Sequence, residues 1–182
     1  SYSLNNDNSE ARWRLAMSNI KLGADPKETI ELMQQAVLWH PNVASYNFDF
    51  ASAYYHLWKQ TNNSSYLTSM EEYITKTLNM QPGFSNLYSQ AAYLEFKSGN
   101  IQKAIEYERL TLIANPDQTY GWVLLAKLYY DLGQKDQCIK AMEQAYIRSG
   151  ETLVLKNNFQ ELKAAEDIRS VPFSVYFPEP SQ

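Results

Sequence analysis

Apolar residues recur three and four positions apart along most of this chain, which is the spacing of one face of an α-helix. The clearest example is the set Trp122, Leu125, Ala126 and Tyr129. Short breaks that contain glycine or proline separate such stretches, namely Pro41, Pro82, Gly99, Pro116 and Gly133. Because glycine and proline interrupt or end helices, the pattern predicts an all-α chain of short amphipathic helices joined by tight turns.

The helical stretches also repeat one another. Aligning the stretch from Tyr88 with that from Trp122 pairs residues 34 positions apart, which are Ala92 with Ala126, Gly99 with Gly133, and Ala104 with Cys138. One further step back places Tyr54 and Pro82 at the ends of a third copy, with Met70 in the small-residue position. Trp13 and Pro41 keep the 28-residue interval from opening aromatic to closing proline and define a fourth copy.

The repeats are therefore expected at about 10–41, 51–82, 85–116 and 119–150, in a single domain that covers residues 1–182. Their aromatic, small and glycine positions resemble the tetratricopeptide-repeat (TPR) family, over about residues 9 to 150. This resemblance implies a right-handed α-α superhelix of about four helix-turn-helix repeats. A capping helix and an extended tail are expected in residues 151–182, because a repeat array needs an atypical end.

Several element borders can be predicted from local signals. Asp25 followed by Pro26 and Glu28 has the order of an N-cap, a first-position proline and a capping-box acid. Trp13 and Tyr54 are 41 residues apart, seven more than the period, so this junction contains a longer turn or an extended helix. The sequence 158–161 resembles a capping box, and the proline-rich tail from residue 171 is expected to be extended, packed on the repeats or on a neighbour.

The family resemblance implies a ligand groove lined by the first helix of each repeat. Position by position, the groove candidates are Arg14, Ser18, Lys21, Tyr55, Lys59, Asn86, Ser89, Tyr93, Phe96, Tyr120, Val123, Lys127 and Tyr130. Tyrosine and lysine dominate this set, which suits an acidic or aromatic peptide or protein partner. The family's carboxylate clamp for chaperone tails is not matched, because its places hold Arg14, Ser18, His56, Asn86 and Gln90.

Other functional classes find little support in the composition. The net charge of −4 has no basic footprint, so no nucleic-acid partner is expected. Neither His40 nor His56 has a second ligand at a metal spacing, so no metal, cofactor or catalytic residue is expected. Cys138 occupies a buried small-residue slot and is expected to be inert.

The paired acids are expected on solvated helix faces; these are Glu71, Glu72, Glu106 and Glu108. No stretch approaches the length of apolar residues that a membrane span requires, and the compartment is left open.

Two functions remain as hypotheses. The first is a non-catalytic scaffold that binds a peptide or protein in the concave groove. The alternative is an extramembrane module, because the aromatic-rich first junction resembles the soluble C-terminal region of bacterial O-antigen ligase-like membrane proteins. In that case a saccharide is a candidate ligand. A homodimer through the terminal repeat or tail is a third expectation.

Overall fold

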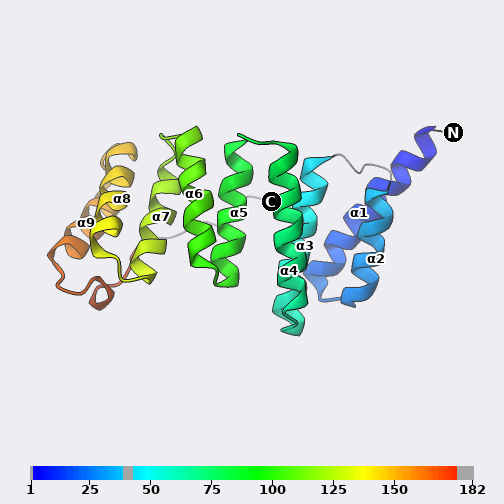
Figure 1. The fold of residues 1–182 in the computed structure, drawn as a ribbon, viewed down its shortest axis with the longest axis horizontal. Helices are drawn as coiled ribbons and strands as arrows, with labels where there is room; N and C mark the ends of the chain where they lie inside the picture. The colour runs from blue at the N-terminus through cyan, green and yellow to red at the C-terminus, as the bar shows by residue number, and fades with distance from the viewer. Residues whose placement is uncertain (1, 39–42, 176–182) are drawn as a thin grey trace. The chain divides into compact units, whose positions relative to one another are not determined.

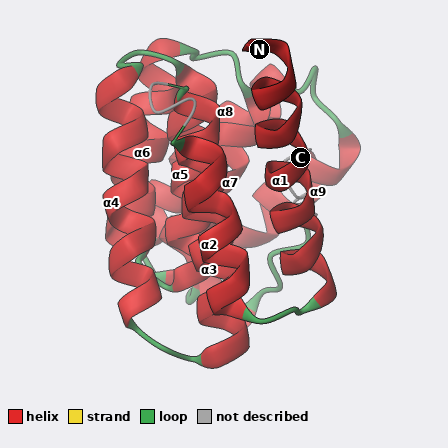
Figure 2. Cartoon of the chain, turned by 90° about the vertical axis from the view of Figure 1, so that its right-hand side faces the viewer, coloured by secondary structure: helices red, strands yellow, loops and turns green. Residues whose placement is uncertain are grey.

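The computed structural model describes residues 2–38 and 43–175. Every element of regular secondary structure in these residues is a helix (Figures 1 and 2). The chain divides into two compact units, residues 1–82 and 83–182. Unit 1 contains α1 (Tyr2–Leu22), α2 (Pro26–Val37), α3 (Ala44–Thr61) and α4 (Ser65–Met80). Unit 2 contains α5 (Ser85–Ser98), α6 (Ile101–Ala114), α7 (Thr119–Asp131), α8 (Lys135–Arg148), α9 (Leu153–Ala164) and the 3-10 helix η1 (Ile168–Ser170).

The helices pack in consecutive pairs, which are α1 with α2, α3 with α4, α5 with α6, and α7 with α8. One pair lies in each predicted repeat, so the all-α helix-turn-helix repeat is confirmed. The helices α4 and α6 end at Met80 and Ala114, just before Pro82 and Pro116, as expected. The closing proline of the first repeat, Pro41, lies outside the described residues together with His40, and the single domain over all four repeats stays a prediction.

The turns within the pairs need a left-handed backbone. Gly99 ends α5 with a φ of 90°, a conformation that costs glycine nothing. At the corresponding end of α3 the residue is Asn62, with a φ of 56°. Asparagine is the non-glycine residue that tolerates this conformation best, so the second pair turns without the usual glycine.

The described part of the long first junction, residues 43–53, belongs almost entirely to a lengthened α3. α3 begins at Ala44, ten residues before the opening aromatic Tyr54, and packs on both α1 and α2. Asn47 is fully buried in the added turns, and its side-chain amide donates to the Val43 carbonyl at 3.1 Å. The predicted N-cap of α2 is confirmed, because Asp25 Oδ1 accepts from the Lys27 amide at 2.8 Å.

The core of unit 1 contains a cluster of aromatic rings from α1, α3 and α4. Phe50, 1% exposed, lies with its ring centroid 5.6 Å from that of Trp13 and 4.6 Å from that of Tyr73. Tyr46 and Tyr54 extend the cluster, at 5.2 Å from Trp13 and 5.7 Å from Tyr73. Each such pair contributes about 0.5–1.5 kcal/mol beyond the area it buries, so the aromatic residues hold the three helices together.

In unit 2 the predicted small-residue positions lie where helices meet. Ala92, Ala104, Ala126 and Cys138 are all fully buried within one apolar core. Two helix backbones approach closely only where side chains are small, so these positions set the spacing of the helices.

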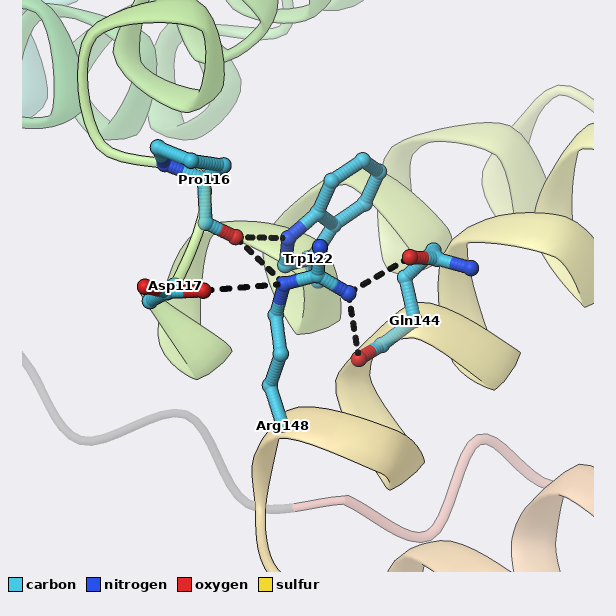
Figure 3. A network of polar contacts seen from close by, with 5 residues as sticks. All are labelled: Pro116, Asp117, Trp122, Gln144 and Arg148. Atoms are coloured by element: carbon cyan, nitrogen blue, oxygen red, sulfur yellow. Dashed lines mark hydrogen bonds and ion pairs between the residues drawn. The ribbon is translucent and has the colours of Figure 1, made fainter.

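The junction between the pairs of unit 2 is fixed by a polar network (Figure 3). The carbonyl of Pro116 accepts from Trp122 Nε1 at 2.7 Å and also from Arg148 Nε. Arg148 lies 5.1 Å from the Trp122 ring centroid, donates to Gln144, and has its Nε 3.8 Å from Asp117 Oδ1. The loop before α7 is thereby tied to both α7 and α8.

After the last repeat the expected capping helix is present as α9, which packs on α8. The predicted capping box at 158–161 is wrong, because α9 already begins at Leu153 and Asn158 lies in its middle. Asn158 is 1% exposed. Ile168 of η1, also 1% exposed, anchors the start of the tail in the core of unit 2.

The burial of Ala126 gives a direct test of the register. Replacing Ala126 with Trp is expected to lower the free energy of unfolding by about 1–3 kcal/mol or more, since a fully packed site has no room for the ring. Urea unfolding followed by circular dichroism measures the change. The control Lys140→Trp, on an exposed position of α8, should stay within about 0.5 kcal/mol of the unchanged chain. Equal stabilities of the two variants would contradict the register.

Candidate functional site

Three of the predicted groove residues come together on the first helices of unit 2. Phe96 is on α5, and Lys127 and Tyr130 lie one turn apart on α7. The Lys127 ammonium is 5.7 Å from the Phe96 ring centroid and 5.3 Å from that of Tyr130. We refer to these three half-buried residues as the α5–α7 face. Consecutive helix pairs therefore contribute to one surface.

The charge of Lys127 is balanced within this face. Its ammonium forms an ion pair with Asp131, one turn further along α7, and both side chains are 24% exposed. Cation–π contacts contribute about 0.5–1 kcal/mol at exposed sites and more when desolvated. A lysine held by a carboxylate and by aromatic rings presents less free positive charge than its type suggests, so the face is chiefly aromatic.

The described part of the C-terminal tail lies on the same face. Residues 171–175, which we term the tail segment, place Phe173 with its ring 5.4 Å from Tyr130 and 5.9 Å from the Lys127 ammonium. The Tyr130 hydroxyl donates to the Val171 carbonyl at 2.7 Å. Asn158 of α9 donates to the carbonyl of Pro172 at 3.0 Å. Sequence reasoning assigned Asn158 to a helix cap and missed this contact.

The other groove candidates of unit 2 are placed differently. Tyr93 is half-buried on α5, with the Lys97 ammonium 5.2 Å from its ring centroid, and Asn86 is exposed. Ser89 is 7% exposed and belongs to the packed interior. Tyr120 is half-buried, and burial, with a smaller effect of the Glu108 carboxyl, raises the pKa of Tyr120 to about 12.

The candidates of unit 1 form no comparable cluster among the described contacts. Arg14 is exposed and forms an ion pair with Glu10 at 2.6 Å. Tyr55 is 8% exposed, and the exposed Lys59 places its ammonium 5.8 Å from the Tyr55 ring centroid. The side chain of Lys21 lies outside the described residues. A groove shared by all four repeats stays a prediction.

Glu108 was expected on a solvated face, and this expectation is wrong. Its side chain is fully buried, and neither carboxyl oxygen has a hydrogen-bond partner. A Cβ added at Gly121 would lie 2.5 Å from Glu108 Oε1, so the carboxyl is pressed against the α7 backbone. Burial raises the pKa of Glu108 to about 8. The repeat alignment contains the missed signal, because the residues 34 positions before and after, Ile74 and Met142, are both fully buried.

The inert role expected for Cys138 agrees with its surroundings. Burial, followed by the charge of Asp131, raises the pKa of the Cys138 thiol to about 12, so the thiol stays protonated at neutral pH. Within residues 2–38 and 43–175, no group of three or more His, Cys, Asp or Glu side chains is arranged to hold a metal ion.

Solved structures similar to this chain are TPR proteins. The thermophilic TPR protein TTC0263 of Thermus thermophilus has a TM-score of 0.63 at 20% identity, covering 86% of this chain and 82% of that one. MamA of Desulfovibrio magneticus, from residue 41 to its end, has a TM-score of 0.66 at 15% identity, covering 90% and 88%. Another MamA structure has a TM-score of 0.62 at 17% identity, covering 79% and 80%. The chain thus has the tetratricopeptide-repeat fold, as its sequence predicts.

No protein-family model matches the chain, and no curated protein matches it. The similar structures give no support to the resemblance to O-antigen ligase-like proteins. Among the helices of the described residues, none is long and apolar enough to cross a membrane.

The buried carboxyl of Glu108 predicts a pH dependence of stability. Its pKa is about 8 in the folded chain against an ordinary value of 4.5, so between these values the folded state holds a proton that the unfolded state has lost. Stability should therefore fall as the pH rises, by about 2 kcal/mol between pH 6 and pH 8. Asp49, whose pKa burial raises to about 6, acts mainly below this range.

Glu108→Gln should remove this fall, as measured by urea unfolding at several pH values. Glu106→Gln, at an exposed position on the same helix, is the matched control and should retain it. The same fall in the Glu108→Gln chain would show that another group is responsible.

Proposed function

We propose that this chain is a non-catalytic scaffold that binds an extended peptide or protein segment, with the α5–α7 face as its contact surface. The observation that carries this proposal is the convergence of Phe96, Lys127 and Tyr130 from two consecutive helix pairs. Aromatic side chains lose little conformational entropy on binding and bury a large area, which makes such a surface suitable for a protein ligand. The TPR fold allows many functions, so it supports this proposal only as an analogy.

The local charges favour one of the two ligand classes suggested by the sequence. Because Lys127 is already paired with Asp131, an acidic ligand would have to compete with an existing carboxylate. An aromatic or apolar group instead gains contact with the rings of Phe96 and Tyr130 without that competition. Tyr93 and Lys97 provide a second aromatic and basic pair on α5. We therefore favour an aromatic segment over an acidic one.

The alternative, an extramembrane module of a glycan ligase or polymerase, rests on a resemblance in the sequence alone. A saccharide ligand and a homodimer are likewise expectations from the sequence. Tyrosine-rich faces suit saccharides as well as peptides, so the experiment that tests the scaffold includes a saccharide arm.

Replacing Tyr93 and Lys127 together with Ala should reduce partner binding by about tenfold or more, because Lys127 belongs to the α5–α7 face and Tyr93 lies one turn before Phe96 on α5. The measurement is affinity capture on the immobilised full chain, with mass spectrometry of the eluted proteins and titration of the protein identified. Helicity by circular dichroism should be unchanged, since neither residue is fully buried.

The control variant Gln102→Ala/Lys140→Ala changes exposed residues of α6 and α8 and should bind normally. A partner held equally by the Tyr93→Ala/Lys127→Ala chain would place its site elsewhere. Binding on a glycan array without any protein partner would favour the glycan-related alternative.

A further inference from the structure

The tail segment is bound by side chains of α7 and α9 and forms no regular structure of its own. Two successive carbonyls, those of Val171 and Pro172, accept hydrogen bonds from Tyr130 and Asn158. The next side chain, Phe173, lies against Tyr130 and Lys127. Backbone carbonyls held by donors from helices, next to one inserted aromatic ring, are the kind of contact that an extended peptide makes with a helical groove.

We propose that the α5–α7 face together with Asn158 is a binding site for an extended partner segment that carries a Pro–Phe pair. The chain's own tail segment occupies this site within the same molecule. This inference rests on the proposed function and adds to it the ligand class and an internal competitor. The tail is then an intramolecular ligand that a partner must displace.

The contacts define what the site recognises. Asn158 and Tyr130 donate hydrogen bonds, so they bind carbonyl oxygens, which every peptide has. Proline keeps its carbonyl although it lacks an N–H group, so it is compatible with the site. The fixed φ of proline holds the backbone extended before binding and lowers the entropy lost on binding. The residue after it faces Lys127 and Tyr130, where an aromatic ring makes a cation–π contact and a ring contact. Lys127 is neutralised by Asp131, so the segment needs no acidic residue.

Asn158 itself indicates that this site is built for the purpose. Its side chain is 1% exposed on the buried face of α9, between Leu155 and Leu162, and its described hydrogen bond is the one to the Pro172 carbonyl. A buried amide is costly without a partner, so the fold retains it where a carbonyl of an extended segment is bound.

The contacts of the tail segment are strong enough to compete with a partner segment for the site and weak enough for that partner to displace the tail. Tyr130 and Lys127 are only half-buried, Phe173 is half-buried, and Pro172 and Ser174 are exposed. A tethered ligand has a high effective concentration, about millimolar for a short flexible connection, so it weakens an external ligand without preventing its binding. A partner segment with more contacts than residues 171–175 would displace it.

The test uses the full chain and a fluorescent peptide with the sequence of residues 170–177. Binding is measured by fluorescence anisotropy for the unchanged chain and for Phe173→Ala. Loss of the Phe173 ring should release the tail, so Phe173→Ala should bind the peptide at least tenfold more tightly. A peptide with Ala in place of its own residue 173 should not bind. Phe84→Ala, which removes a 53% exposed ring elsewhere in unit 2, is the matched control and should bind like the unchanged chain.

One further variant and two further measurements separate a binding site from a merely structural cap. Adding Tyr130→Phe to Phe173→Ala removes the hydroxyl donor but keeps the ring, and it should weaken peptide binding again. A Phe173→Ala chain that is less stable but binds the peptide no better would show that the tail is only a cap and overturn the proposal. Light scattering tests whether the tail binds its own molecule. A dimer of the unchanged chain that is lost in Phe173→Ala would mean that the tail binds a second copy, and it would overturn the intramolecular occupation.

The failure of this proposal can be told apart from the failure of the proposed function. Equal peptide affinity of Phe173→Ala and the unchanged chain overturns the role of the tail even where partner capture depends on Tyr93 and Lys127. If capture is unaffected by those two residues while Phe173→Ala gains peptide affinity, the tail site stands and the scaffold proposal fails for that partner.

Discussion

The close approach of paired helices at small residues is the constraint on which the other features depend. Ala104 and Cys138 occupy the same place in successive copies, and both are fully buried. Met70 fills that place one copy earlier, also fully buried, because an unbranched side chain adapts to an irregular gap. The small residues bring the helices of unit 2 near enough for Phe96 of α5 to reach Lys127 of α7. The geometry of the candidate site thus depends on the same small residues that form the core.

The repeat made most of the fold predictable from the sequence. Its period and its breaks at Gly99, Pro82 and Pro116 were sufficient to place the helix pairs, because these residues act locally on the backbone. The sequence allows either a turn or a longer helix before Tyr54, since residues 44–53 contain neither glycine nor proline. The length of that helix is decided by packing against α1 and α2, which no local signal reports.

The site was only partly predictable, for two different physical reasons. Glu108 was assigned by its residue type to the surface, whereas its column in the repeat is apolar and buried, so the periodic position overrides the polarity of the side chain. The tail contact was missed because Tyr130 and Val171 are 41 residues apart and meet only in the folded chain. Repeat positions place Phe96, Lys127 and Tyr130 among the groove candidates, but nothing in the repeat describes a segment that lies outside it.

The Pro116 carbonyl also determines where the chain tolerates change in length. It accepts from Trp122 and Arg148 at once, so one added residue between α6 and α7 would break both bonds and move the loop away from two helices. The loop between α3 and α4 is different, because Asn62, Asn63 and Ser64 are all exposed and their hydrogen bonds within the described residues are to near neighbours. A reporter tag or an inserted domain therefore belongs in the α3–α4 loop, while the α6–α7 loop should be left at its natural length.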